Sequence, residues 1–164
     1  MPVTNVNSDL DALTMTITAE FAATTDRVWE LWSDPRQLER WWGPPTHPAT
    51  FADYDLSAGE RITYSMTGPD GEKFDGRWRV EDVDPPNRLS LADDETDDEG
   101  KPSDGGPTGM TVTIAGHQGA TTMSIVSHFA SRESLEQMIE MGMEQGFSET
   151  VAQAGRLLSE VERA

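Results

Sequence analysis

The chain has 164 residues, and its 30 acidic side chains outnumber its 12 basic ones to give a formal net charge of −18. This length fits one domain with a substantial core, and the negative charge opposes binding to nucleic acids or to anionic membrane surfaces. Because the sequence contains no cysteine, disulfides, thiolate metal sites and cysteine nucleophiles are excluded.

We expect residues 1–10 to be a flexible N-terminus and residues 11–164 to form a single domain. The N-terminal segment lacks a basic stretch followed by an apolar run, so no signal peptide is expected. No apolar stretch approaches the roughly 20 residues that a helix needs to span a bilayer. The sequence therefore predicts a cytoplasmic protein that does not associate with a membrane.

A strand and two short helices are predicted at the start of the domain. Residues 13–21 alternate between apolar and polar side chains, which is typical of a half-buried strand. Residues 24–26 then offer a helix N-cap, and apolar side chains follow at helical spacing: Val28, Trp29, Leu31 and Trp32. The Asp-Pro pair at 34–35 ends this helix and starts a second short one, which residues 43–45 end.

Six strands are predicted between residues 49 and 129. They cover residues 49–56, 60–67 and 73–83 and the neighbourhoods of residues 89–91, 110–114 and 123–129. Their turns are too short for parallel crossovers, so the sheet is predicted to be antiparallel. Residues 93–107 hold no apolar side chain able to anchor them, and we expect a mobile acidic loop there.

One long helix is predicted over residues 132–161. At 1.5 Å per residue it would be about 45 Å long, and only a large curved sheet could cover the apolar stripe along it. Apolar residues and one glycine recur every three or four positions, which places them on one face: Leu135, Met138, Ile139, Gly142, Met143, Phe147, Val151, Ala154, Leu158 and Val161.

Several motifs in this order resemble those of one known family. The most specific are Trp29-x-x-Trp32-Ser33-Asp34-Pro35 and Leu38-x-x-Trp41-Trp42-Gly43-Pro44, supported by Tyr64-x-Met66-x-Gly68-Pro69-Asp70-Gly71, Gly76-x-Trp78-x-Val80-Glu81 and Gly142-x-x-x-Gly146-Phe147. Over roughly residues 11–160 the chain is similar to the activator of Hsp90 ATPase homologue (AHSA1-like) family of the START/Bet v 1-like (SRPBCC) superfamily. Two departures are Gly59-Glu60, where many relatives have a Gly-Gly pair, and the longer acidic segment at 93–107.

The resemblance implies an α+β helix-grip (Bet v 1-like) fold. In this fold a curved antiparallel sheet of about seven strands wraps around a long C-terminal helix, and two short helices follow the first strand. The family is functionally mixed and includes lipid and hormone carriers, polyketide cyclases and chaperone co-factors, so the fold does not decide the function.

The resemblance also implies a cavity between the sheet and the long helix that holds a small hydrophobic molecule, such as a lipid or a polyketide-like aromatic. Apolar walls with few polar groups suit such a ligand, and methionines make an adaptable wall, although the same methionines would also serve as ordinary core. The expected ligand-binding residues are Trp32, Trp41, Tyr64, Met66, Trp78, Met110, Met138, Gly142, Met143 and Phe147.

Two features of this expected site have alternative interpretations. Gly142 and Gly146 are four residues apart on one helix face, where missing side chains either let a strand approach closely or leave volume for a ligand. Trp41 and Trp42 either pack the second short helix against the sheet or gate the mouth of the cavity.

Two further functions stay open beside ligand binding. A polyketide cyclase or aromatase-like enzyme would need a buried acid or base with a shifted pKa, and the inward faces contain almost none. An Hsp90-type co-chaperone, or another protein-interaction module, would need an exposed apolar or charged patch. A homodimer is compatible with the fold, but no residue pattern requires one.

No catalytic residue, cofactor or metal site is predicted. His47 lies near the expected pocket rim and is the histidine to consider for acid–base chemistry, whereas His117 is expected in a hairpin turn and His128 on an outer face. No two histidines have metal-ligand spacing. The acidic segment lacks the glycine position of a calcium-binding loop, and nucleotide-binding and nucleophile motifs are absent.

Overall fold

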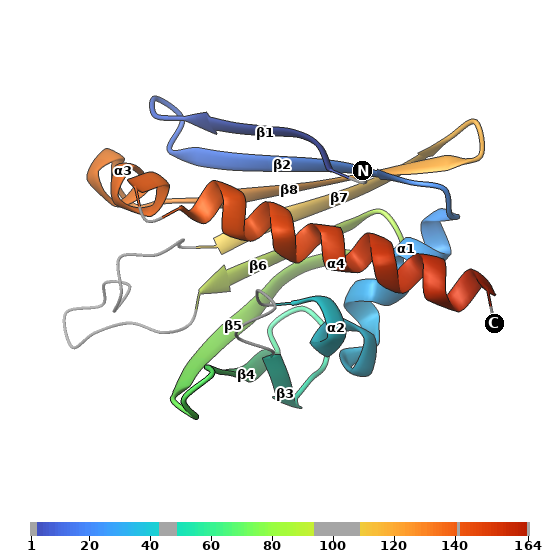
Figure 1. Cartoon of the computed structure of the whole chain (residues 1–164), viewed down its shortest axis with the longest axis horizontal. Helices are drawn as coiled ribbons and strands as arrows, with labels where there is room; N and C mark the ends of the chain where they lie inside the picture. Colours follow the sequence, from blue (N-terminus) through green and yellow to red (C-terminus); the bar gives the residue numbers. More distant parts are fainter. Residues whose placement is uncertain (1–2, 43–48, 94–108, 141, 164) are drawn as a thin grey trace.

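The computed structural model describes residues 3–42, 49–93, 109–140 and 142–163 (Figure 1). In these residues eight strands form one antiparallel sheet in the order β1-β2-β8-β7-β6-β5-β4-β3. The strands are β1 (Val3–Asp9), β2 (Thr14–Phe21), β3 (Ala49–Asp53), β4 (Arg61–Thr67), β5 (Lys73–Asp84), β6 (Arg88–Asp93), β7 (Gly109–His117) and β8 (Ala120–His128). The helices are α1 (Thr25–Ser33), α2 (Pro35–Trp41), α3 (Arg132–Glu140) and α4 (Met143–Arg163).

The predicted helix-grip fold is confirmed. Figure 1 shows α4 lying across one face of the sheet, with α1 and α2 beside it. The sheet has eight strands among the described residues rather than about seven. The additional strand is β1, so the two short helices follow the second strand and not the first.

The N-terminal segment is an edge strand, and the expectation of a flexible N-terminus is wrong for Val3–Asp9. This strand pairs with β2 antiparallel, from Val3 opposite Ala19 to Asp9 opposite Thr14. Val6 packs against the main core. The other residues of β1 are mostly polar, so the strand shows no clear alternation of apolar and polar side chains. Its backbone hydrogen bonds to β2 define it instead.

The two short helices begin as the sequence predicts. Thr24 is the N-cap of α1, and its hydroxyl accepts a hydrogen bond of 3.1 Å from the backbone N–H of Arg27. Asp34 is the N-cap of α2, with Pro35 in the first turn. Both caps satisfy N–H groups that a helix leaves without an internal partner.

The predicted single C-terminal helix is two helices, so a continuous rod of about 45 Å is wrong. Gly142 separates α3 from α4 with a φ of +86°, and its N–H donates to the carbonyl oxygen of Ile139 at 3.0 Å. Glycine adopts this left-handed conformation readily, which is why it commonly ends helices. The apolar spacing continues through residue 142, so periodicity alone does not reveal the break.

Two hydrophobic clusters follow from this arrangement. The main core joins the inner face of the sheet to α1, α2 and α4. A smaller cluster at the other end of the sheet consists of Met15, Phe129 and Leu135, with Leu10, Met138 and Ile139 packed against it. The apolar face predicted for β2 is confirmed from Met15 to Phe21.

Among the described helices, none has the length and hydropathy needed to cross a bilayer. The predicted acidic loop lies almost entirely outside the described residues.

Candidate functional site

Eight aromatic side chains lie in one cluster between the sheet and the helices, and we call them the aromatic cluster. The ring centroids of neighbouring members are 4.8–5.9 Å apart, and many pairs meet edge to face. Such pairs stabilise beyond the area that they bury. The members are Trp32, Trp41, Trp42, Phe51, Tyr54, Tyr64, Trp78 and Phe147.

Trp42 connects the helices to the sheet and to α4. As the C-cap of α2 it is held by a backbone hydrogen bond of 2.8 Å from its N–H to the carbonyl oxygen of Leu38. Its ring contacts one ring on each of four elements: the centroid distances are 5.9 Å to Trp32, 5.6 Å to Trp41, 5.1 Å to Trp78 and 5.7 Å to Phe147. The aromatic cluster is therefore continuous from α1 to α4.

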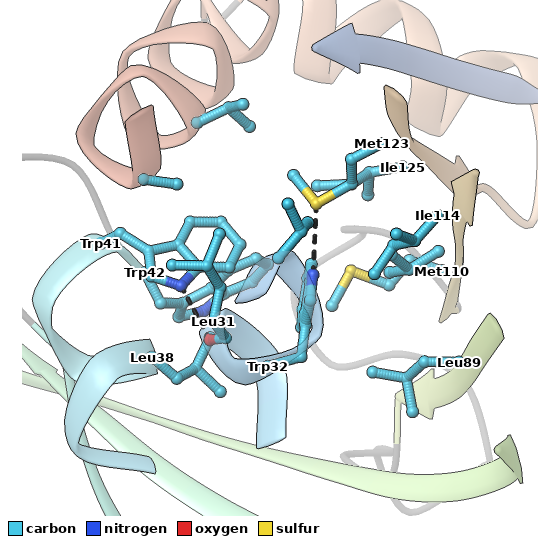
Figure 2. Packing of buried hydrophobic residues seen from close by; sticks show 14 of the residues in the cluster. Leu31, Trp32, Leu38, Trp41, Trp42, Leu89, Met110, Ile114, Met123 and Ile125 are labelled. Atoms are coloured by element: carbon cyan, nitrogen blue, oxygen red, sulfur yellow. Dashed lines mark hydrogen bonds between the residues drawn. The ribbon is translucent and has the colours of Figure 1, made fainter. Parts of the chain in front are cut away.

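Three buried indole N–H groups in this cluster have different partners. Figure 2 shows Nε1 of Trp32 donating to the Sδ atom of Met123 at 3.3 Å and Nε1 of Trp41 donating to the carbonyl oxygen of Leu31 at 2.9 Å. The third donor, Nε1 of Trp42, is buried and has no hydrogen-bond partner among the described residues. An indole nitrogen can only donate, so Trp42 presents an unused donor.

The hydrogen bond from Trp41 to Leu31 follows from the proline that separates α1 and α2. In a continuing helix the carbonyl oxygen of Leu31 would accept a hydrogen bond from the residue four positions later. That residue is Pro35, which has no N–H. Nε1 of Trp41 supplies the missing donor, so the Asp-Pro turn also orients the Trp41 ring.

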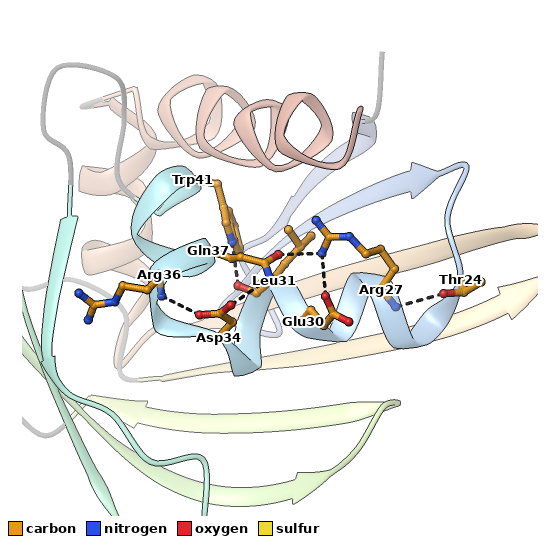
Figure 3. Close-up of polar contacts among 8 residues, drawn as sticks. All are labelled: Thr24, Arg27, Glu30, Leu31, Asp34, Arg36, Gln37 and Trp41. Atoms are coloured by element: carbon orange, nitrogen blue, oxygen red, sulfur yellow. Dashed lines mark hydrogen bonds and ion pairs between the residues drawn. The ribbon is translucent and has the colours of Figure 1, made fainter. Parts of the chain in front are cut away.

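Polar side chains hold α1 against α2 on the outer side of this turn (Figure 3). The Asp34 carboxylate accepts from the backbone N–H of Arg36 at 3.0 Å and from Nε2 of Gln37 at 3.1 Å. Nη1 of Arg27 donates to Oε1 of Gln37 at 2.7 Å and lies 3.4 Å from Oε2 of Glu30. These contacts fix the angle between the helices and hence the meeting of their tryptophans.

Gly146 lies on a side of α4 that faces the rest of the molecule. Thr150 and Ala154, one and two turns further on, are buried. Nε2 of Gln153, seven residues on and therefore on the same side, donates to the carbonyl oxygen of Trp41 at 3.1 Å. Yet a Cβ atom at Gly146 would meet no described atom within 4 Å beyond its chain neighbours and its own helix backbone. Gly146 therefore borders open space on the side of α4 that runs along α2.

Uncharged groups dominate the cluster. Burial, and secondarily the negative charge of Asp34, raise the pKa of Tyr54 well above its usual value, so its hydroxyl stays protonated near neutral pH. Two other unpaired buried nitrogens among the described residues are Nε and Nη2 of Arg27, whose charge is already balanced by Glu30. The cluster thus offers ring faces and neutral donors rather than charged groups.

The described part of the chain has few buried polar side chains. Among the residues whose side chains the structure describes, they are Thr121, Ser127 and Thr150, so none of these buried polar side chains is a carboxylate or a histidine. The described residues also hold no group of three His, Asp or Glu side chains placed to bind a metal ion.

A family model described as activator of Hsp90 ATPase homolog 1-like protein matches residues 22–158. The chain belongs to this family. The match covers α1 to most of α4 and includes every member of the aromatic cluster, so the resemblance seen in the sequence is confirmed.

Solved structures share the fold of this chain. A crystal structure of a protein from Mycobacterium smegmatis is 46% identical, with a TM-score of 0.84, and the match covers 98% of this chain and 99% of that one. A solution structure from Arthrobacter aurescens is 45% identical, with a TM-score of 0.88 and coverage of 96% and 92%. An AHSA1-like protein from Aeromonas hydrophila shares the fold at 22% identity, with a TM-score of 0.66 and coverage of 90% and 94%. No curated protein matches the sequence.

The structure brings together most of the side chains that the sequence predicts to bind a ligand. Five of them belong to the aromatic cluster: Trp32, Trp41, Tyr64, Trp78 and Phe147. Met110 is buried in the same core, and Met66 is half-buried against it. Whether they contact a ligand stays a prediction.

Two of the other predicted residues, Met138 and Gly142, lie away from the aromatic cluster. Met138 on α3 packs in the smaller cluster with Met15 and Phe129. Gly142 is exposed at the break between α3 and α4, and the side chain of Met143 lies outside the description. The cause is the helix break, because residues before and after Gly142 do not share one straight stripe.

Sequence reasoning missed three members of the cluster as site residues. The sequence presents Trp42 only as a packing residue or a gate, and it places Phe51 and Tyr54 in a predicted strand without a role. The consecutive pair Trp41-Trp42 was a usable signal, because neighbouring residues at a helix end point in different directions. The contacts of Phe51 and Tyr54 depend on long-range packing that no local pattern encodes.

The histidines lie away from this cluster or outside the description. His47 is not among the described residues, so its acid–base role stays untested. His128 is exposed, as predicted, with Nε2 at 3.2 Å from the hydroxyl of Thr111. His117 ends β7 at a tight hairpin, where the turn residues Gln118 and Gly119 have φ values of +48° and +81°.

Proposed function

We propose that this protein binds a small hydrophobic molecule between the sheet and α4, beside the aromatic cluster. The observation that carries the proposal is the open space beside Gly146, on a side of α4 whose next two turns are buried. Gly146 itself is half-buried, so the space beside it is accessible from outside and offers volume that a ligand can fill.

The surrounding side chains support this proposal by their chemistry. Tyr64, Met66 and Phe147 are half-buried against the main core, so part of each is accessible from outside. Aromatic rings and a flexible thioether are the usual lining of pockets for apolar ligands. Carriers of hydrophobic molecules also occur in the superfamily that the sequence resembles.

No comparable observation supports the two alternative functions, a cyclase-type enzyme and a co-chaperone. A cyclase needs a positioned acid or base, and the buried polar side chains that the structure describes are Thr121, Ser127 and Thr150. A co-chaperone role rests on the name of the family alone.

The proposal is tested by filling the space beside Gly146. The protein is first examined by native mass spectrometry for a co-purified molecule, and then by thermal unfolding with oleate, naringenin and fluorene. At a concentration of about 100 Kd a ligand stabilises by about 2.7 kcal/mol, which raises Tm by several degrees for a domain of this size. Gly146→Trp should remove this shift.

Gln145→Trp is the matched control, because Gln145 is the preceding residue of α4 and is exposed. It should keep the full shift. Retention of binding by folded Gly146→Trp would show that the site is elsewhere. A wild-type protein that carries no small molecule and is stabilised by none of the three probes would contradict the proposal itself.

A further inference from the structure

We infer that the ligand of the proposed site is an uncharged, largely apolar molecule whose hydrogen-bond acceptor, such as a carbonyl oxygen, binds the indole N–H of Trp42. This inference rests on the proposed function and specifies the chemical class of its ligand. It depends on the unpaired donor of Trp42, the open space beside Gly146 and the absence of charge in the aromatic cluster.

The donor of Trp42 differs from those of its two tryptophan neighbours. Trp32 and Trp41 are completely buried, and each indole N–H has a protein acceptor. Trp42 is only 9% exposed, yet its N–H has no partner in the described part of the chain. Buried polar groups are nearly always hydrogen-bonded, so an exception requires an explanation. An acceptor brought by a ligand provides one.

The donor and the open space lie in the same part of the molecule. The Trp42 ring contacts Phe147, the residue directly after Gly146, with centroids 5.7 Å apart. The same side of α4 is bonded to the backbone of Trp41 through Gln153. The Trp42 ring therefore lies beside the first turns of α4, the part of the helix that contains Gly146.

The charge of the site argues for a neutral ligand. The eight members of the aromatic cluster are uncharged. Arg36, which donates to the carbonyl oxygen of Phe51, is already paired with Glu39, and burying an unpaired ion is costly. The net charge of −18 also repels anions. Ring faces attract cations, but the indole N–H needs an acceptor, which a simple cation lacks. A neutral ring system with a ketone, lactone or ether oxygen satisfies both the rings and the donor.

Fluorene and 9-fluorenone form a matched pair of probes, because they share a planar ring system and differ chiefly in one carbonyl group. A neutral hydrogen bond makes a net difference of about 2- to 10-fold in affinity. We therefore expect fluorenone to bind the wild-type protein about 2- to 10-fold more tightly than fluorene. In Trp42→Phe, which keeps an aromatic ring but lacks the donor, the two probes should bind equally.

Trp29→Phe is the control variant, because Trp29 lies on α1 and is not one of the eight rings; it should keep the wild-type preference. An equal preference for fluorenone in Trp42→Phe and in the wild type would overturn the inference. Equal binding of both probes to the wild type would overturn it too, while leaving the proposed function intact. If neither probe binds, the inference and its application to this ring class both fail, and the Gly146→Trp experiment with oleate and naringenin then decides the proposed function separately.

A spectroscopic measurement decides the matter even if Trp42→Phe does not fold. In a proton–nitrogen correlation spectrum the five tryptophans give separate indole signals, and the Trp42 signal is assigned by selective labelling and contacts to Phe147. Fluorenone should move the Trp42 indole proton downfield, whereas fluorene should not. A Trp42 proton that responds identically to the two probes would overturn the inference.

Discussion

At the scale of single residues, Trp41 and Trp42 are neighbours in sequence with opposite hydrogen-bonding situations. Nε1 of Trp41 satisfies the carbonyl oxygen of Leu31, which Pro35 cannot serve. Nε1 of Trp42 has no described partner. Both rings are buried, so replacement by phenylalanine removes a similar amount of apolar surface at each position.

We expect Trp41→Phe to be the more destabilising of the two substitutions. It leaves a buried carbonyl oxygen without a donor, at a cost of about 1–3 kcal/mol, whereas Trp42→Phe removes a donor that has no protein partner to lose. The difference in the free energy of unfolding, measured by urea denaturation without ligand, should therefore be about 1–3 kcal/mol. Equal losses for the two variants would contradict this account.

At the scale of elements, the turn between α3 and α4 sets the direction in which α4 crosses the sheet. Gly142 has a φ of +86° and is exposed, whereas Gly146 has ordinary helical geometry one turn later. A Cβ atom would meet no described neighbour within 4 Å at either position. Substitution by alanine therefore probes the backbone alone.

Alanine should have opposite effects at these two glycines. Gly142→Ala forces an L-residue into the left-handed region and should destabilise by about 1–2 kcal/mol. Gly146→Ala improves helix propensity and should stabilise by up to about 1 kcal/mol. The free energies of unfolding from urea denaturation give both values, and a change of the same sign at both positions would refute the assignment of the break.

The elements that the sequence predicts best are those with strong local patterns. The alternation from Met15 to Phe21 and the caps at Thr24 and Asp34 are all present in the structure. Edge strand β1 lacks such a pattern, because its pairing is made by the backbone. The break at Gly142 was hidden because a glycine fits both a helical stripe and a left-handed turn.

At the scale of the whole molecule, charge opposes compactness. The chain carries 30 acidic residues against 12 basic ones, and several ion pairs of the described residues, such as Arg88 with Asp82, are well exposed. Exposed pairs contribute little, so they do not offset the general repulsion of a surface with one sign of charge.

Salt should therefore stabilise this protein. Raising NaCl from about 10 mM to about 1 M shortens the screening length from about 30 Å to about 3 Å, and Tm at pH 7 should rise by several degrees. The control is the same titration near pH 5, closer to the isoelectric point of about 4.3, where the rise should be smaller. A Tm that does not change with salt at pH 7 would show that charge repulsion is unimportant.

The candidate site was predictable only in part. The rings at 32, 41, 64, 78 and 147 could be proposed because their motifs place them on inward faces of a helix-grip fold. The unpaired N–H of Trp42 could not, because it depends on which acceptors the folded chain happens to bring near. Polar satisfaction is a property of the three-dimensional arrangement, and no spacing in the sequence reports it.

The position of β2 in the sheet has a consequence for the order in which the protein is synthesised. β2 is made early, but its inner neighbour is β8, with Phe21 opposite Thr121 and Thr14 opposite His128. The indole N–H of Trp32 likewise cannot form its hydrogen bond until Met123 has been added, 91 residues later. Pairings so distant in sequence form slowly. A nascent chain therefore emerges from the ribosome with its tryptophan-rich segment unburied, and the sheet can close only after β8, which ends at residue 128 of 164, has been made.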